Sequence, residues 1–129
     1  MYVEQEDVYY YITVLNENYQ HPDMPEGAEQ GILKGLYRLP IERKTKTDRH
    51  VQLMGSGSIL PEVIAAAEIL EHDYGVSSEV WSATSLTEVR REAQQIERWN
   101  LLHPLEEPKV PYVTQLLEGH AGPVVIATT

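Results

Sequence analysis

Residues 51–83 read VQLMGSGSILPEVIAAAEILEHDYGVSSEVWSA, and this stretch predicts a strand, a helix and a second strand in succession. Residues 51–54 form a short apolar run closed by Gly-Ser-Gly-Ser, which is typical of a buried strand followed by a turn. Apolar residues then recur at helical spacing: Ile59, Leu60, Val63, Ile64, Ala67 and Leu70. Residues 80–83 are the next strand signal. Because such a unit joins parallel strands by a right-handed crossover, we expect an α/β fold.

Local signals set the ends of the helices. Ser58 can cap the helix that follows it, Pro61 suits the first turn, and Gly75 is a good C-terminal stop. Residues 85–88 have the Ser-x-x-Glu spacing of a capping box, which opens a helix running toward residue 100. Further on, residues 112–117 are compatible with either strand or helix, and residues 123–127 read as another buried strand.

The first half of the chain is less regular. Residues 8–15 are aromatic, β-branched or aliphatic throughout, so we expect a strand covered on both faces. A short helix is predicted over residues 25–36, with Gly27, Gly31 and Gly35 along one face where another backbone can approach. Residues 42–49 are polar and read as a connector.

Both termini carry strand signals without visible neighbours. A buried strand at residues 8–15 has nothing before it to pair with, and the last strand stops close to the end of the chain. Exposed apolar strand edges are an aggregation hazard, so we expect a fragment of a longer protein. In that case residues 8–15 either pair with another copy or lie detached.

Composition narrows the classes of partner. Ten basic and 20 acidic residues give a net charge of -10, which argues against nucleic acid and anionic membrane surfaces. The absence of cysteine excludes disulfides and thiolate chemistry, and the acidic first residues do not form a signal peptide. We therefore expect a cytoplasmic protein.

Four separated blocks of sequence carry a resemblance to a known family. They are residues 9–19 with 24–27, residues 52–60, residues 66–70, and residues 97–106, which read ERWNLLHPLE. In this order they resemble the homodimeric bacterial first component of pyruvate dehydrogenase, a family with the transketolase architecture. The resemblance implies an α/β three-layer sandwich with a mostly parallel sheet. It would be a truncated transketolase C-terminal-like domain, preceded by the last strand of the pyrimidine-binding domain.

The resemblance also implies an organisation and an activity. Residues 1–24 would end the middle, pyrimidine-binding domain, residues 25–49 would form a connector helix and linker, and residues 50–129 would begin the C-terminal domain. The family decarboxylates pyruvate with thiamine diphosphate and Mg, and it transfers the acetyl group to a lipoyl domain of the dihydrolipoyl acetyltransferase component. Its cofactor ligands and catalytic residues would lie upstream of Met1. We therefore expect no catalytic, cofactor-binding or metal residue here, no cofactor bound to this piece, and an inactive scaffold that contributes homodimer contacts.

A loop at residues 16–21 offers the candidate site residues. Asn16, Asn18 and His21 follow the carboxyl end of the predicted first strand, where α/β sheets usually place ligands, and in related folds this loop lies toward the substrate entrance. They are thus candidates for lining a substrate channel. The alternative is an ordinary turn between two domains, because Asn and His are common turn residues.

Other polar groups have simpler interpretations. The Gly-Ser-Gly-Ser turn at residues 55–58 could cradle a phosphate, but it lacks the third glycine or the lysine of the known phosphate loops, so a tight turn is the alternative. The five histidines are scattered and read as separate surface or turn residues, with the one at position 103 anchoring a loop. Trp81, Trp99 and the tyrosines at positions 9–11 read as core and interface anchors.

Two other functions remain open beside the enzyme interpretation. The chain could be a non-catalytic α/β module that binds a partner or associates with itself, and the length of the native polypeptide distinguishes this from the enzyme. The other function is that of a nucleotide-binding regulator built on Gly55 and Gly57.

Overall fold

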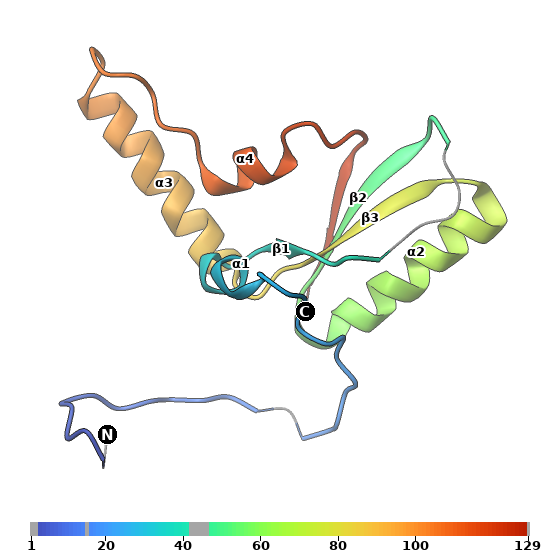
Figure 1. The fold of residues 1–129 in the computed structure, drawn as a ribbon, viewed down its shortest axis with the longest axis horizontal. Coiled ribbons are helices and arrows are strands. Elements are labelled where there is room, and N and C mark those ends of the chain that lie inside the picture. Colours follow the sequence, from blue (N-terminus) through green and yellow to red (C-terminus); the bar gives the residue numbers. More distant parts are fainter. Residues whose placement is uncertain (1–2, 15, 42–46, 129) are drawn as a thin grey trace.

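The computed structural model describes residues 3–14, 16–41 and 47–128. Within these ranges the strands form one sheet in the order β1-β3-β2-β4 (Figure 1). The strands are β1 (Tyr37–Arg38), β2 (His50–Gly55), β3 (Ser77–Ser82) and β4 (Val124–Ala127). β2 is parallel to both β3 and β4, and β1 is antiparallel to β3. The expectation of an α/β fold with a mostly parallel sheet is confirmed.

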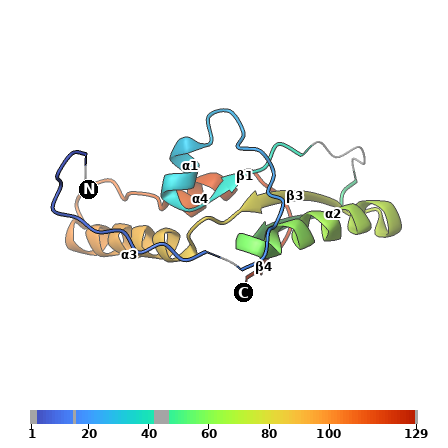
Figure 2. The ribbon, with the colours of Figure 1, turned by 90° about the horizontal axis from the view of Figure 1, so that it is seen from below.

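Helices cover both faces of the sheet. They are α1 (Glu29–Lys34), α2 (Leu60–Tyr74), α3 (Leu86–Leu102) and α4 (Tyr112–Leu117), with a 3-10 turn at Gly57–Ile59 before α2. In Figure 1, α2 lies on one side of the strands, and α3 and α4 lie on the other; Figure 2 shows the same separation from below. A core of Leu53, Leu60, Val63, Ala67 and Val80 joins α2 to its face, and a second core of Leu36, Met54, Trp81 and Ala83 packs against α3 and α4. These are the three layers expected from the sequence.

The predicted helix signals are mostly confirmed. Gly75 ends α2 in the left-handed region at φ 61°, Pro61 lies in the first turn, and the side chain of Ser85 accepts a hydrogen bond from the backbone N–H of Glu88. The prediction that Ser58 caps α2 was wrong. The 3-10 turn precedes α2, so Ser58 lies inside that turn and Ile59 takes the capping position.

The first helix is shorter than predicted. α1 spans residues 29–34 rather than 25–36, because Gly27 has φ 77° and cannot continue a helix. The close backbone approach predicted for the glycine face holds at Gly31 and Gly35 only. A Cβ at Gly31 would lie 2.6 Å from the Cβ of Tyr37, and one at Gly35 would overlap the carbonyl oxygen of Ser85, whereas Gly27 has nothing within 4 Å.

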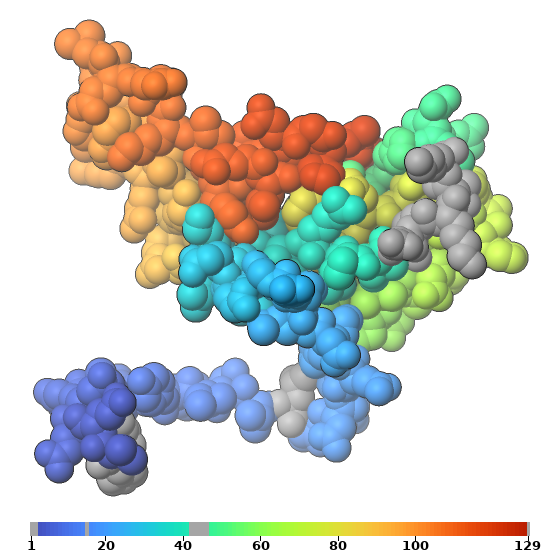
Figure 3. All heavy atoms as spheres, in the orientation of Figure 1, coloured from blue at the N-terminus to red at the C-terminus, as the bar shows by residue number. Residues whose placement is uncertain are grey.

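The prediction of a buried strand at residues 8–15 was wrong for this chain. Residues 8–14 have no strand conformation and are exposed, with Ile12 at 77%. Figure 3 shows the N-terminal segment extending away from the folded body. A strand needs a neighbour to satisfy its backbone N–H and C=O groups, and none of the strands in the described part of the chain pairs with this segment. In the single chain the run lies detached, which is one of the two arrangements expected for it, and pairing with another copy stays a prediction. Leu15 lies outside the described residues.

The last strand also differs from its prediction. β4 forms over residues 124–127, but it lies at the edge of the sheet and Val125 is 50% exposed, so it is not buried. Residues 112–117, which were compatible with strand or helix, form α4. Of the predicted polar connector, residues 42–46 lie outside the described residues. Nowhere in the described ranges is a helix long and apolar enough to cross a membrane.

Candidate functional site

The three candidate residues of the loop at 16–21 do not share one location. His21 and Pro22 line a small hollow at the carboxyl ends of β2 and β3, together with Tyr37, Gly57, Leu60, Ser82, Ala83 and Thr84. Asn16 and Asn18 are exposed and do not line it. The structure therefore brings His21 to the sheet and leaves the two asparagines outside.

The Gly-Ser-Gly-Ser turn at residues 55–58 links the end of β2 to the end of β4 through hydrogen bonds. The backbone N–H of Ser56 donates to the carbonyl oxygen of Ala127 at 3.3 Å, and its hydroxyl donates to Oγ1 of Thr128 at 2.8 Å. At Gly55 an added Cβ would lie 3.0 Å from the Cα of Leu60, so the turn packs closely against α2. These contacts favour the tight-turn interpretation over a phosphate cradle.

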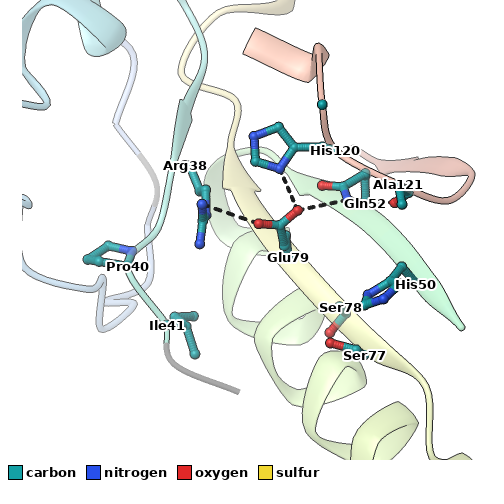
Figure 4. Close-up of a pocket in the computed structure, with 11 residues that line it drawn as sticks. Arg38, Pro40, Ile41, His50, Gln52, Ser77, Ser78, Glu79, His120 and Ala121 are labelled. Atoms are coloured by element: carbon teal, nitrogen blue, oxygen red, sulfur yellow. Dashed lines mark hydrogen bonds and ion pairs between the residues drawn. The ribbon is translucent and has the colours of Figure 1, made fainter. Parts of the chain in front are cut away.

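The larger hollow lies at the opposite, amino ends of β2 and β3 (Figure 4). Its volume is about 790 Å³. It is lined by β1 and the residues after it, by the starts of β2 and β3, and by the loop before β4. The lining residues are Arg38, Pro40, Ile41, His50, Gln52, Ser77, Ser78, Glu79, Gly119, His120 and Ala121.

Glu79 is the centre of the polar contacts in this hollow. Its Oε2 accepts from Gln52 Nε2 at 2.9 Å and lies 2.6 Å from His120 Nδ1. Its Oε1 lies 3.2 Å from Arg38 Nη1. Gln52 and Glu79 face each other because they are partners in the parallel register of β2 and β3. One carboxylate thus links β1, β2, β3 and the loop before β4.

Gln52 extends this network into the core. It is 1% exposed, and its Nε2 also donates to the carbonyl oxygen of Ala121 at 2.8 Å. Its Oε1 accepts from the indole N–H of Trp81 at 2.8 Å, and the ring of Trp81 meets that of His120 edge-on at 5.2 Å. A buried amide with both ends satisfied fixes the positions of its neighbours.

The loop that carries His120 depends on its glycines. Gly119 and Gly122 both have positive φ, at 82° and 94°. A Cβ at Gly122 would overlap the backbone of His50, whereas Gly119 has nothing within 4 Å. Gly122 therefore lets the loop lie flat against β2 and brings His120 over Glu79.

The electrostatic balance keeps Glu79 ionised. Burial raises the pKa of this carboxyl, but hydrogen bonds from Gln52 and His120 and the positive charge of Arg38 outweigh it, so the pKa lies below its ordinary value. These donors therefore stabilise the ionised form of the carboxylate. Among residues 3–14, 16–41 and 47–128, no group of three acidic, histidine or cysteine side chains could hold a metal ion. We assign no cofactor or metal to these residues.

Sequence reasoning missed this cluster. The prediction that the histidines are separate surface or turn residues was wrong for His120, which pairs with Glu79, while His103 stacks on Trp99 at 4.3 Å. Trp81 is a core residue as predicted, and the tyrosines at 9–11 are exposed, so in this chain they are not core anchors. The available signal was a glutamine inside the apolar run of residues 51–54.

Comparison with known proteins gives the class of the fold. Residues 35–129 match the family described as the transketolase-like TK C-terminal domain. The match covers well over half of the chain, and the chain belongs to this family.

Relatives along almost the whole chain give a narrower class. Proteins named pyruvate dehydrogenase E1 component are 58% identical over 129 residues in Escherichia coli (strain K12) and 52% identical over 128 residues in Cupriavidus necator and Pseudomonas aeruginosa. In each case the alignment covers 99% of this chain and 14% of the relative. The chain is thus a homologue of pyruvate dehydrogenase E1 components that spans about one seventh of their length.

Proposed function

We propose that this chain is part of a thiamine-diphosphate-dependent pyruvate dehydrogenase, which decarboxylates pyruvate and transfers the acetyl group to a lipoyl domain. The observation that carries the proposal is 58% identity across 99% of the chain to a protein named pyruvate dehydrogenase E1 component. The relatives are about seven times longer, so the activity belongs to a longer polypeptide.

Within that enzyme we propose that these residues act as scaffold and interface. Among the described residues, the one carboxylate that lines the larger hollow is engaged by three neighbouring side chains, which supports a structural role. Apolar side chains are exposed in the N-terminal segment, on β4 and at the far end of α3, where Leu101 is 79% exposed. Such surfaces are typical of contacts with other parts of a larger protein.

The finer assignments follow from the same proposal. Residues 1–24 would end the pyrimidine-binding domain, and residues 50–129 would begin the C-terminal domain. Residues 25–49 would form the helix and linker that connect these two domains. The longer protein would bind thiamine diphosphate and Mg through residues outside this chain. It would form a homodimer, act on the dihydrolipoyl acetyltransferase component, and work in the cytoplasm. The loop with Asn16, Asn18 and His21 would line the substrate channel, a role supported by the place of His21 in the carboxyl-end hollow.

The test of the enzyme proposal uses the longer protein that contains this sequence. Its acetylation of a free lipoyl domain should require both pyruvate and thiamine diphosphate, and the 129-residue chain alone should show none. A longer protein that binds thiamine diphosphate but does not turn over pyruvate would contradict the proposal. For the loop, Asn18→Ala and His21→Ala should lower turnover or acetyl transfer, and unchanged values for both would remove these residues from the channel.

A second candidate function is a non-catalytic module that associates with itself. The detached apolar segment at residues 8–14 favours it, because such a segment can pair with a strand of another copy. Intact mass of the native polypeptide separates the two candidates. A mass seven times that of this chain supports the enzyme, and a mass of 14.7 kDa supports the module.

A further inference from the structure

We propose that the hollow at the amino ends of β2 and β3 binds a small oxyanion, a carboxylate or phosphate, through Arg38, Ser77 and His120. The site is formed by three strands and the loop before β4 (Figure 4). Its volume of about 790 Å³ lies in the range of roughly 300–1,000 Å³ typical of small-molecule pockets. This binding role is separate from the proposed enzyme activity.

Several polar groups in the hollow are left over for a ligand. A guanidinium has about five N–H donors, and within the described residues Arg38 directs only Nη1 at Glu79. His120 uses Nδ1 on the same carboxylate, which leaves Nε2 for another partner. The hydroxyl of Ser77 also lines the hollow.

The hollow also carries no excess negative charge. Glu79 is the only acidic side chain that lines it among the described residues, and it already contacts Arg38, Gln52 and His120. The positive charge of Arg38 balances that carboxylate, although the chain carries -10 overall.

The walls limit the size and nature of the ligand. Pro40 and Ile41 form an apolar side opposite the donors. A planar carboxylate with a short carbon chain fits both surfaces, and inorganic phosphate satisfies the donors alone. Both ligands are compact oxyanions that a guanidinium, a hydroxyl and an imidazole can bind.

The two tryptophans provide a matched probe and control in one experiment. The indole N–H of Trp81 donates to Gln52 beside the hollow, whereas Trp99 stacks on His103 near the far end of α3. In 15N-labelled chain at constant ionic strength, acetate, pyruvate and inorganic phosphate are titrated separately, with chloride as reference. We expect a saturable shift of the Trp81 indole signal with at least one of these anions and no shift of the Trp99 signal. The proposal would be overturned if no anion saturated the shift below about 10 mM, which corresponds to a binding free energy near −3 kcal/mol. Equal shifts of the two indole signals would overturn it as well.

Variants then assign the contacts. Arg38→Gln should weaken anion binding at least about tenfold, because a charge-assisted hydrogen bond is lost, while Arg98→Gln on α3 should leave it unchanged. If Arg38→Gln does not give a folded spectrum, Ser77→Ala carries the test, with His50→Gln as the control, because His50 lines the hollow but is not one of the three assigned contacts. Unchanged affinity in Ser77→Ala would overturn the assignment. Binding of phosphate alone identifies a phosphate site, and binding of acetate and pyruvate identifies a carboxylate site.

Discussion

Two apolar runs in this chain differ in their burial: one lies inside the sheet and the other is exposed. Residues 80–83 include Trp81, which is 1% exposed in the middle of the sheet, whereas residues 8–14 include Ile12, which is 77% exposed on a detached segment. Both runs have the composition of a buried strand. The difference lies in their neighbours, because β3 has β1 on one side and β2 on the other, and no strand among the described residues pairs with the N-terminal run. A strand-like composition is therefore not sufficient for a strand, because the segment also needs a neighbouring strand to pair with.

The largest expected effect is on stability in the folded body. Trp81→Ala should lower the free energy of unfolding of the chain by about 3–5 kcal/mol, because it removes a buried indole and leaves the Oε1 of Gln52 without its donor. The matched variant Ile12→Ala should change it by less than about 0.5 kcal/mol. Urea unfolding followed by circular dichroism measures both. Equal losses would mean that residues 8–14 are packed in solution.

The next effect concerns the loop that holds His120. Gly122→Ala should destabilise the chain by about 1–3 kcal/mol more than Gly119→Ala, although both residues have positive φ. The reason is that only the methyl group at 122 meets the backbone of His50. Thermal unfolding of the two variants side by side gives the difference, and equal melting temperatures would show that the loop does not lie against β2.

A smaller and pH-dependent effect is expected at Glu79. Glu79→Gln should cost about 1–3 kcal/mol at neutral pH, because Arg38 and His120 lose a charged partner. The pKa of Glu79 is lowered in the folded chain, so its contribution is fully present above the ordinary pKa of a glutamate and is lost as the pH falls through the lowered value. Unfolding curves of the two proteins should converge in acid. A difference that stays constant down to acidic pH would contradict this.

Much of the sheet and its helices could be predicted from the sequence because local patterns encode them. The helical spacing in residues 59–70 and the Ser85–Glu88 pair each lie within one element, and the structure confirms them. The cluster around Glu79 could not be predicted in this way. Gln52 and Glu79 meet through the register of two strands 27 residues apart, and His120 arrives on a loop 41 residues further on. The one local sign was a polar side chain in an apolar strand.

The failed prediction at residues 8–15 has a different cause. The pattern correctly marks an apolar run, but strand formation depends on hydrogen bonds to a neighbour that local sequence cannot show. The same holds for β4, whose apolar side chains are half exposed at the edge of the sheet. Residues 8–14 and β4 each have at least one side without a partner strand, whereas residues 80–83 have a partner on both sides.

Backbone hydrogen exchange at residues 8–14 tests the central claim most directly, in the 129-residue chain and in the longer protein that contains it. Our account predicts that these amides exchange at the rate of an unstructured peptide in the short chain and become strongly protected in the longer one, where a neighbouring strand covers them. Equally fast exchange in both proteins would contradict it, because the run would then have no partner in either.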